Sequence, residues 1–229
     1  MTSILRHGLV CLLAFTLQAC AMQRTATAAG GTAIRTGTGT LRTVEPILSW
    51  RELRDRNVVR QRFDYSCGAA ALATLIRYYF GDDVSEEGIL AGILRSMTAA
   101  EVLEREVNGL SLLDLRLQAE RMGYQAVGVR LDLAALPRLT GPVIVHLERD
   151  DYRHFAVLKG VREDRIYLAD PSLGNVRRSV DRFAIEWSGI ALVLGKQGFG
   201  TPRRHPLAPE DQHVVPNEVL AARKSVFAR

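Results

Sequence analysis

The feature that most constrains this chain is a nearly all-apolar run, Ala69 to Leu75, which directly follows Cys67 and Gly68. The run contains one polar side chain, Thr74, and every position favours or tolerates a helix. A helix that is apolar all round is usually buried. We therefore expect a helix through the middle of the core, with Cys67 in its first turn.

The position of Cys67 allows two interpretations. Unpaired backbone N–H groups and the positive end of the helix dipole favour a thiolate at a helix start, which makes a cysteine reactive at neutral pH. Free cysteine is also among the most buried residue types, so a structural core residue is the alternative. This segment alone does not decide between them.

The N-terminus has the pattern of an export signal. Arg6 supplies a positive charge, and residues 8–17 form an apolar run too short to span a bilayer comfortably. Leu17 to Cys20 resembles the bacterial lipoprotein cleavage box, which predicts a lipidated Cys20 and membrane contact through that lipid. Ordinary cleavage after Ala21 is the competing outcome. Either way we expect the protein in the bacterial periplasm or cell envelope.

The chain has three cysteines, and the predicted export determines how they are interpreted. Cys11 lies in the signal, Cys20 at the cleavage site and Cys67 in the predicted helix. If Cys20 is lipidated, Cys67 is the remaining thiol and no intramolecular disulfide forms. Oxidising compartments favour paired cysteines, so an unpaired one is a candidate reactive thiol.

Composition changes along the chain predict four parts. We expect a signal peptide at 1–19, a flexible linker rich in Ala, Gly and Thr at 20–45, a folded domain at 46–197 and a peripheral tail at 198–229. Residues 34–41 of the linker have the composition of a weak edge strand.

Within the predicted domain, helix signals come first and strand signals second. Ser85, Thr98 and Ser111 have the sequence context of helix N-caps. From residue 124 onward the pattern changes to strands, which we expect at 125–131, 142–147, 154–161, 165–169 and 190–195. This order predicts an α+β fold with an antiparallel sheet.

Charge and composition limit the partners. Hydrophobic residues make up 47% and charged residues 24% of the chain, as in globular proteins. The net charge is +5, but basic and acidic residues are interleaved without a basic stripe, so no nucleic-acid partner is expected. His and Cys do not cluster at ligand spacing, so neither a metal nor a cofactor is expected.

Two further residues complete a chemical hypothesis around Cys67. A charged turn near 162–165 should fold the two flanking strands into a hairpin that brings His154 and Asp170 to one open end. A histidine that is oriented by a carboxylate can keep a neighbouring cysteine ionised. Gln61 supplies an amide N–H which, with the backbone N–H of Cys67, could bind an oxyanion.

Each of these residues also has a structural interpretation. His154 could be a strand-edge histidine, Asp170 could start a turn before Pro171, and Gln61 by itself carries no signal. His146 is a rival base because it too ends an apolar run. It has only an adjacent acidic turn in place of a hairpin carboxylate, so the sequence favours His154.

The motifs together resemble the bacteriocin-processing (double-glycine) cysteine peptidase family, whose fold is papain-like. The resemblance covers residues 55–196 and is carried by Gln61, by Cys67, Gly68, Ala70 and Leu72, by His154, Phe155 and Val157, and by Asp170 and Pro171. It implies Cys67 as nucleophile, His154 as base, Asp170 as orienting acid and Gln61 as oxyanion donor. It also implies cleavage after a Gly-Gly pair in a leader peptide.

The chain departs from the family pattern in two respects. Many members are the N-terminal domain of a peptide-exporting ABC transporter, whereas this sequence contains no transmembrane block or phosphate-binding loop and has its own export signal. It is similar in this to exported members encoded with functional-amyloid secretion systems. The residue before the cysteine is often acidic in transporter-linked members and is Ser66 here, so the Gly-Gly preference stays open.

The leading hypothesis is an envelope thiol peptidase that cleaves an exported peptide or protein, with a secretion-system component among the expected partners. One alternative is a catalytically silent peptide-binding lipoprotein that assists a secretion system. Another is a relative that uses the same triad to hydrolyse or transfer other acyl groups, because fold and triad do not fix the substrate.

Overall fold

The computed structural model describes residues 31–36, 39–46, 48–149 and 152–209, which belong to two units. The first unit contains an antiparallel hairpin of strands β1 (Gly31–Thr36) and β2 (Gly39–Pro46), in which Ile34 pairs with Leu41. This hairpin lies within the linker predicted at 20–45, except for its last residue, Pro46. The predicted signal peptide and Cys20 lie outside the described residues.

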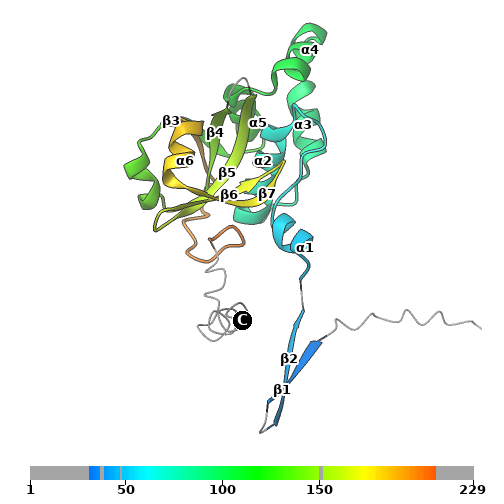
Figure 1. Ribbon diagram of the computed structural model, residues 1–229. Coiled ribbons are helices and arrows are strands. Elements are labelled where there is room, and N and C mark those ends of the chain that lie inside the picture. The colour runs from blue at the N-terminus through cyan, green and yellow to red at the C-terminus, as the bar shows by residue number, and fades with distance from the viewer. Residues whose placement is uncertain (1–30, 37–38, 47, 150–151, 210–229) are drawn as a thin grey trace, which may run out of the picture. The chain divides into compact units, whose positions relative to one another are not determined.

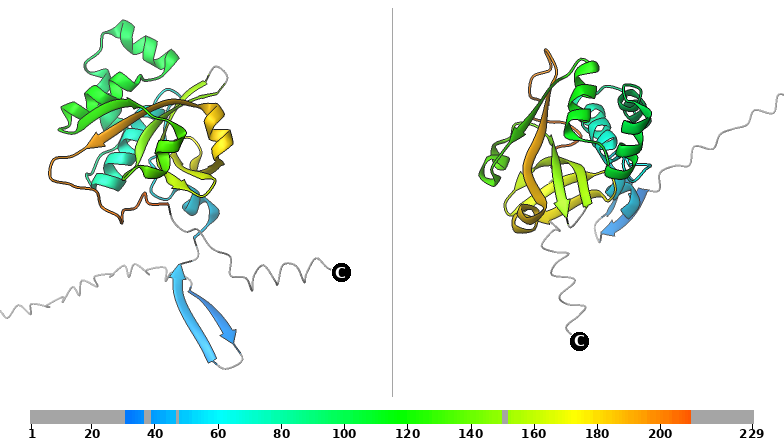
Figure 2. Two further views of the ribbon diagram at one scale, coloured as in Figure 1. Left: turned by 90° about the vertical axis from the view of Figure 1, so that its left-hand side faces the viewer. Right: turned by 90° about the horizontal axis from the view of Figure 1, so that it is seen from above.

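The second unit is built on a six-stranded antiparallel sheet with the order β3-β8-β4-β5-β6-β7. The helices between residues 67 and 121 lie on one face of this sheet, and the short helix at 180–186 packs on the other face, as Figure 1 and the view from above in Figure 2 show. The α+β prediction is therefore confirmed. The strands are β3 (Gln125–Arg130), β4 (Val143–Arg149), β5 (Tyr152–Arg162), β6 (Arg165–Asp170), β7 (Gly174–Ser179) and β8 (Trp187–Gly195).

The central helix is α2 (Cys67–Leu75), and every one of its residues is buried, as its all-apolar sequence predicts. It packs against β5 and against the helices α3 (Glu86–Leu94) and α5 (Leu112–Arg121). It continues as a π-helical turn, η1 (Ile76–Phe80), and ends at Gly81, which adopts a left-handed conformation.

The predicted helix starts are confirmed. The side chains of Ser85, Thr98 and Ser111 each accept a hydrogen bond from a backbone N–H in the first turn of the helix that follows. These helices are α3 (Glu86–Leu94), α4 (Ala99–Asn108) and α5 (Leu112–Arg121). The sequence analysis did not predict α1 (Trp50–Asp55), the 3-10 helix η2 (Leu133–Arg138), β7 or α6 (Val180–Glu186).

The sheet is apolar on both faces. Along β5, Phe155 and Val157 belong to the core around α2, while Ala156 and Leu158 belong to a second core that contains Phe183 of α6. This alternation is the two-residue period of a strand. A core on each face holds the strands in place. Side chains near the strand ends, such as His154 on β5 and Asp170 on β6, are therefore held in place as well.

The segment after β8 packs on the core, in contrast to the peripheral tail expected from residue 198. The Phe199 ring centroid lies 4.9 Å from that of Phe80 and 5.4 Å from that of Tyr79. Leu207 is fully buried, and the side-chain amide of Asn57 donates a 2.9 Å hydrogen bond to the carbonyl of Pro206. The side chains that pack include the apolar Phe199 and Leu207 and the ring of His205, whose centroid lies 4.8 Å from that of Tyr79. Residues 210–229 lie outside the described part.

Within the described residues, the helices are all too short or too polar to cross a membrane.

Candidate active site

The site begins with the thiol at the start of α2. Cys67 is a free cysteine with 3% of its surface exposed. The glycine that follows allows close packing, since a Cβ atom on Gly68 would lie 3.0 Å from the Leu115 side chain and 3.2 Å from Phe155. The first turn of the helix is therefore tightly seated against its neighbours, and the backbone N–H groups of that turn have no partners within the helix.

The hairpin expected from the sequence is present. Strands β5 and β6 pair with Val157 opposite Ala169, and a bulge between Leu158 and Gly160 adjusts the register. At the open end of this hairpin, Nε2 of His154 lies 3.0 Å from Oδ1 of Asp170. The structure thus brings together the two side chains that the sequence analysis placed there.

The Asp170 carboxylate is fixed by the turn that follows it. Its Oδ1 atom accepts hydrogen bonds from the Ser172 backbone N–H at 2.8 Å, the Ser172 hydroxyl at 2.9 Å and the Leu173 N–H at 3.0 Å. Burial tends to raise the pKa of Asp170, but the hydrogen bond and charge of His154, together with these N–H groups, hold the pKa below its usual value. Asp170 is therefore a rigid, ionised partner for His154.

His154 is buried, with 6% of its surface exposed. Burial, the largest effect, tends to lower its pKa, but hydrogen bonds and charges from Asp170 and Cys67 outweigh burial and raise the pKa to about 9. Since Nε2 contacts Asp170, the ring nitrogen left for the thiol is Nδ1. An imidazolium that persists at neutral pH next to a thiol favours the thiolate.

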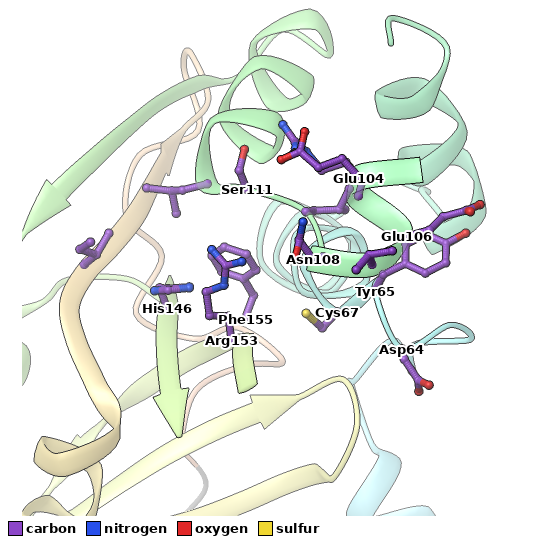
Figure 3. A pocket seen from close by; sticks show the side chains of 16 residues that line it. Asp64, Tyr65, Cys67, Glu104, Glu106, Asn108, Ser111, His146, Arg153 and Phe155 are labelled. Carbon is purple, nitrogen blue, oxygen red and sulfur yellow. The ribbon is translucent and has the colours of Figure 1, made fainter. Parts of the chain in front are cut away.

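A cavity of about 600 Å³ lies over Cys67 (Figure 3). One wall consists of Asp64 and Tyr65, which lie just before the cysteine, and of residues 104–112, which span the end of α4, the turn after it and the first residue of α5. The other wall comes from the sheet and includes His146, Phe155 and Ile190. This size and mixed lining suit a short stretch of peptide.

The structure also places the rival base, His146, on the wall of this cavity. Its Nδ1 lies 3.3 Å from the Ser188 hydroxyl and 3.4 Å from Oε1 of Glu148. Burial and the charges of Arg153 and His154 lower its pKa, against the opposing effect of Glu148. The carboxylate beside His154 is that of the buried Asp170, at 3.0 Å, whereas the carboxylate beside His146 is that of Glu148, whose side chain is 56% exposed. The geometry therefore favours His154 as the base.

Gln61 lies in the loop that leads to Cys67. Its backbone N–H donates to the carbonyl of Pro171 at 3.1 Å, which joins this loop to the turn that holds Asp170. Its side-chain Nε2 donates to the Phe63 carbonyl at 3.0 Å, and its Oε1 is buried without a hydrogen-bond partner among the described residues. Its oxyanion role stays a prediction.

The sequence analysis did not identify two polar residues of the site. Ser172 follows Asp170 and Pro171, and this spacing is a recognisable sign of a side-chain-to-backbone turn. Glu86 begins α3 and is 2% exposed, with its carboxylate directed at the loop before Cys67. Nothing in its local sequence signals that contact. In the described part of the chain, His, Cys, Asp and Glu residues nowhere form a group suited to a metal ion.

A thiol at a helix start, an imidazole within its reach and a carboxylate behind the imidazole, beside a peptide-sized cavity, define the site of a cysteine peptidase. The chain belongs to the peptidase C39 family, whose model matches residues 55–198. It is a cysteine peptidase of that family.

Comparison with known proteins gives similar relatives. The chain is 36% identical over 177 residues to the probable functional amyloid protease FapD of Pseudomonas aeruginosa, which covers 77% of this chain and 74% of the relative. The corresponding protein of Pseudomonas fluorescens is 39% identical over 151 residues, 66% of each chain. The crystal structure of the peptidase domain of Streptococcus ComA, a bi-functional ABC transporter, matches with a TM-score of 0.52 and 24% identity. It covers 61% of this chain and 98% of that domain, and the likeness supports the papain-like fold.

Proposed function

We propose that Cys67 is the nucleophile of a peptidase reaction in which His154 is the general base and acid. The thiol proton passes to Nδ1 of His154, and Sγ attacks the scissile carbonyl carbon. The oxyanion is bound by the Cys67 backbone N–H and the Gln61 amide. His154 then protonates the leaving amine, and water that has been deprotonated by His154 releases the acyl group and restores the thiol.

The observation that carries this proposal is the arrangement of Cys67, His154 and Asp170 next to the cavity. Asp170 holds His154 at 3.0 Å, and Cys67 is close enough to His154 to raise the pKa of the imidazole. The thiol also lines a cavity in which a peptide can reach it. A structural cysteine would need neither the oriented histidine nor the cavity.

We further propose that the substrate is an exported protein of a functional-amyloid secretion system and that cleavage occurs in the cell envelope. The proposal is supported by the export signal that we predict from the sequence and by the similarity to two proteins named as probable functional amyloid proteases. A preference for a Gly-Gly pair before the cleavage site is part of the same proposal and is supported by the motif resemblance.

The test compares strains that carry the wild type or the Cys67→Ala variant, with processing of the exported amyloid proteins followed by mass spectrometry. We expect unprocessed substrate in the variant and cleavage after a small-residue pair in the wild type. Normal processing in the variant would contradict the peptidase role of this chain. Replacing the pair by Val-Val in the substrate tests the Gly-Gly preference separately.

Location is tested by cell fractionation of the wild type and a Cys20→Ala variant. We expect the wild type in the membrane fraction and the variant in the soluble envelope fraction. Equal distribution of the two proteins would contradict lipid anchoring.

A further inference from the structure

The loop of residues 61–66 is largely exposed to solvent, and it also joins the two proposed oxyanion donors, Gln61 and the Cys67 backbone N–H. Arg62, Phe63 and Asp64 are exposed, yet the loop leads directly into Cys67 and contains Gln61. A surface loop that presents groups to a reacting carbonyl must be held in place, because a shift of about 1 Å in such groups can cost about a hundredfold in rate.

The end of the loop is held from inside by a buried carboxylate. Glu86 is 2% exposed, and the residue before the cysteine, Ser66, is 0% exposed. Oε1 of Glu86 lies 2.5 Å from the Ser66 hydroxyl and accepts the Arg62 backbone N–H at 2.9 Å. The Ser66 hydroxyl also accepts the Phe63 N–H at 3.1 Å. One carboxylate oxygen thus bridges both ends of the exposed stretch.

The carboxylate itself is on a rigid support. Glu86 is the first residue of α3, whose start is capped by Ser85 and which packs against α2 and α5. The next residue, Glu87, also contacts the loop, but through an exposed ion pair with Arg62 at 2.6 Å. Two neighbouring carboxylates of α3 therefore contact the same loop, one of them buried and the other exposed.

We propose that Glu86 is a positioning residue for the peptidase reaction, which holds the loop so that the oxyanion-binding groups face the scissile carbonyl. The inference rests on the proposed roles of Cys67 and Gln61. Glu86 does not contact the reacting atoms and acts through Ser66 and Arg62. Cys67 lies on α2, and His154 and Asp170 lie on the β5–β6 hairpin, whereas the hydrogen bonds of Glu86 go to Ser66 and Arg62. We therefore expect the Cys67–His154–Asp170 arrangement to persist without the Glu86 carboxylate.

This separation gives two distinct readouts on the full chain. Iodoacetamide alkylation reports the thiolate and needs no oxyanion site. N-acetylglycinal, a one-residue aldehyde, adds reversibly to the thiol. Sγ bonds to the aldehyde carbon, the thiol proton passes to His154, and the carbonyl oxygen takes the negative charge in the oxyanion site. The bound aldehyde protects Cys67 from alkylation by iodoacetamide. The aldehyde concentration needed for this protection measures the affinity of the oxyanion site for the adduct.

For Glu86→Ala we expect an alkylation pH profile within about threefold of wild type and an aldehyde affinity weaker by about tenfold or more, since loss of one oxyanion donor costs about a hundredfold or more in rate. Glu86→Gln should restore most of the affinity, because its Oε1 can accept the same two hydrogen bonds. The matched control, Glu87→Gln, should leave both readouts unchanged.

An unchanged aldehyde affinity in Glu86→Ala, a failure of Glu86→Gln to restore it, or a wild type that the aldehyde does not protect would each overturn the proposal. If Glu86→Ala does not fold by circular dichroism, Ser66→Ala decides: a weakened aldehyde affinity supports the role, and wild-type values for both readouts overturn it. Failure of the proposed function would appear elsewhere, in a wild-type alkylation profile confined to high pH.

Discussion

Oδ1 of Asp170 lies 3.0 Å from Nε2 of His154 and also accepts three hydrogen bonds from Ser172 and Leu173. A single oxygen thus orients the imidazole and closes the turn. Its geometry and its charge are separable by mutation, because an asparagine keeps an oxygen in this place and loses the charge.

We therefore expect Asp170→Asn to keep the ring orientation and to lose about tenfold in activity near neutral pH, as the pKa of His154 falls. Asp170→Ala removes the orienting oxygen as well and should lose about a thousandfold. Peptide cleavage rates of the two variants, measured across pH, check this order. Equal losses would show that charge, and not orientation, is what Asp170 provides.

The raised pKa of His154 predicts how stability depends on pH. The pKa of a histidine near 6.5 in the unfolded chain rises to about 9 in the folded protein. Protonated His154 therefore adds to the free energy of unfolding. This contribution is on the order of 3 kcal/mol, is fully present below pH 6.5 and is lost as pH rises through 9.

Urea unfolding of the wild type and His154→Gln measures this effect. The difference in the free energy of unfolding between the two proteins should shrink from pH 6 to pH 10. A difference that grows over this interval would mean that His154 is stabilised in its neutral form.

The cavity wall between α4 and α5 depends on one ion pair. Nε of Arg105 lies 2.7 Å from Oδ2 of Asp114, whose side chain is 8% exposed. Asp114 also accepts the Ser111 N–H at 2.7 Å. Arg105→Ala leaves this carboxylate without its charged partner, so we expect a loss of about 2–4 kcal/mol in unfolding free energy and weaker substrate binding.

The matched control for that variant is Arg116→Ala, which breaks an ion pair with Glu120 whose side chains are 44% and 42% exposed. It should cost less than about 0.5 kcal/mol. Similar losses in the two variants, measured by urea unfolding, would contradict a structural role for the Arg105–Asp114 pair.

The segment after β8 should contribute to the stability of the domain. Leu207 is fully buried, so Leu207→Ala should lower the unfolding free energy by about 2–4 kcal/mol. Ile185→Ala, at a side chain that is 79% exposed, should change it by less than about 0.5 kcal/mol. If Leu207→Ala unfolds at the same urea concentration as the wild type, the segment does not belong to the cooperative core.

The sequence predicted the parts of this structure that depend on local signals. The caps at Ser85, Thr98 and Ser111 are written in a few consecutive residues, and the burial of α2 follows from its composition. The His154–Asp170 pair was also predictable, because a short hairpin brings together residues that are close in the chain. Each of these features needs little information from distant residues.

Features that depend on tertiary contacts were missed. The strand β7 is a basic edge strand, and α6 is a short helix whose buried residues are Phe183 and Glu186, so neither shows a clear periodicity. The burial of Leu207 and the contact between Glu86 and Ser66 join separate elements that no hairpin or other local pattern links in the sequence. A single sequence does not reveal such contacts.

The pairing of Cys67 with His154 is measured by the rate of iodoacetamide alkylation of Cys67 from pH 4 to pH 10, in the wild type and in His154→Ala. A free thiol titrates near pH ~8.5, whereas a thiolate paired with imidazolium reacts several units lower. We expect the wild type to react well at pH 5 and the variant to react only near pH 8. Wild-type reactivity confined to high pH, or identical profiles for the two proteins, would contradict the Cys67–His154 pair.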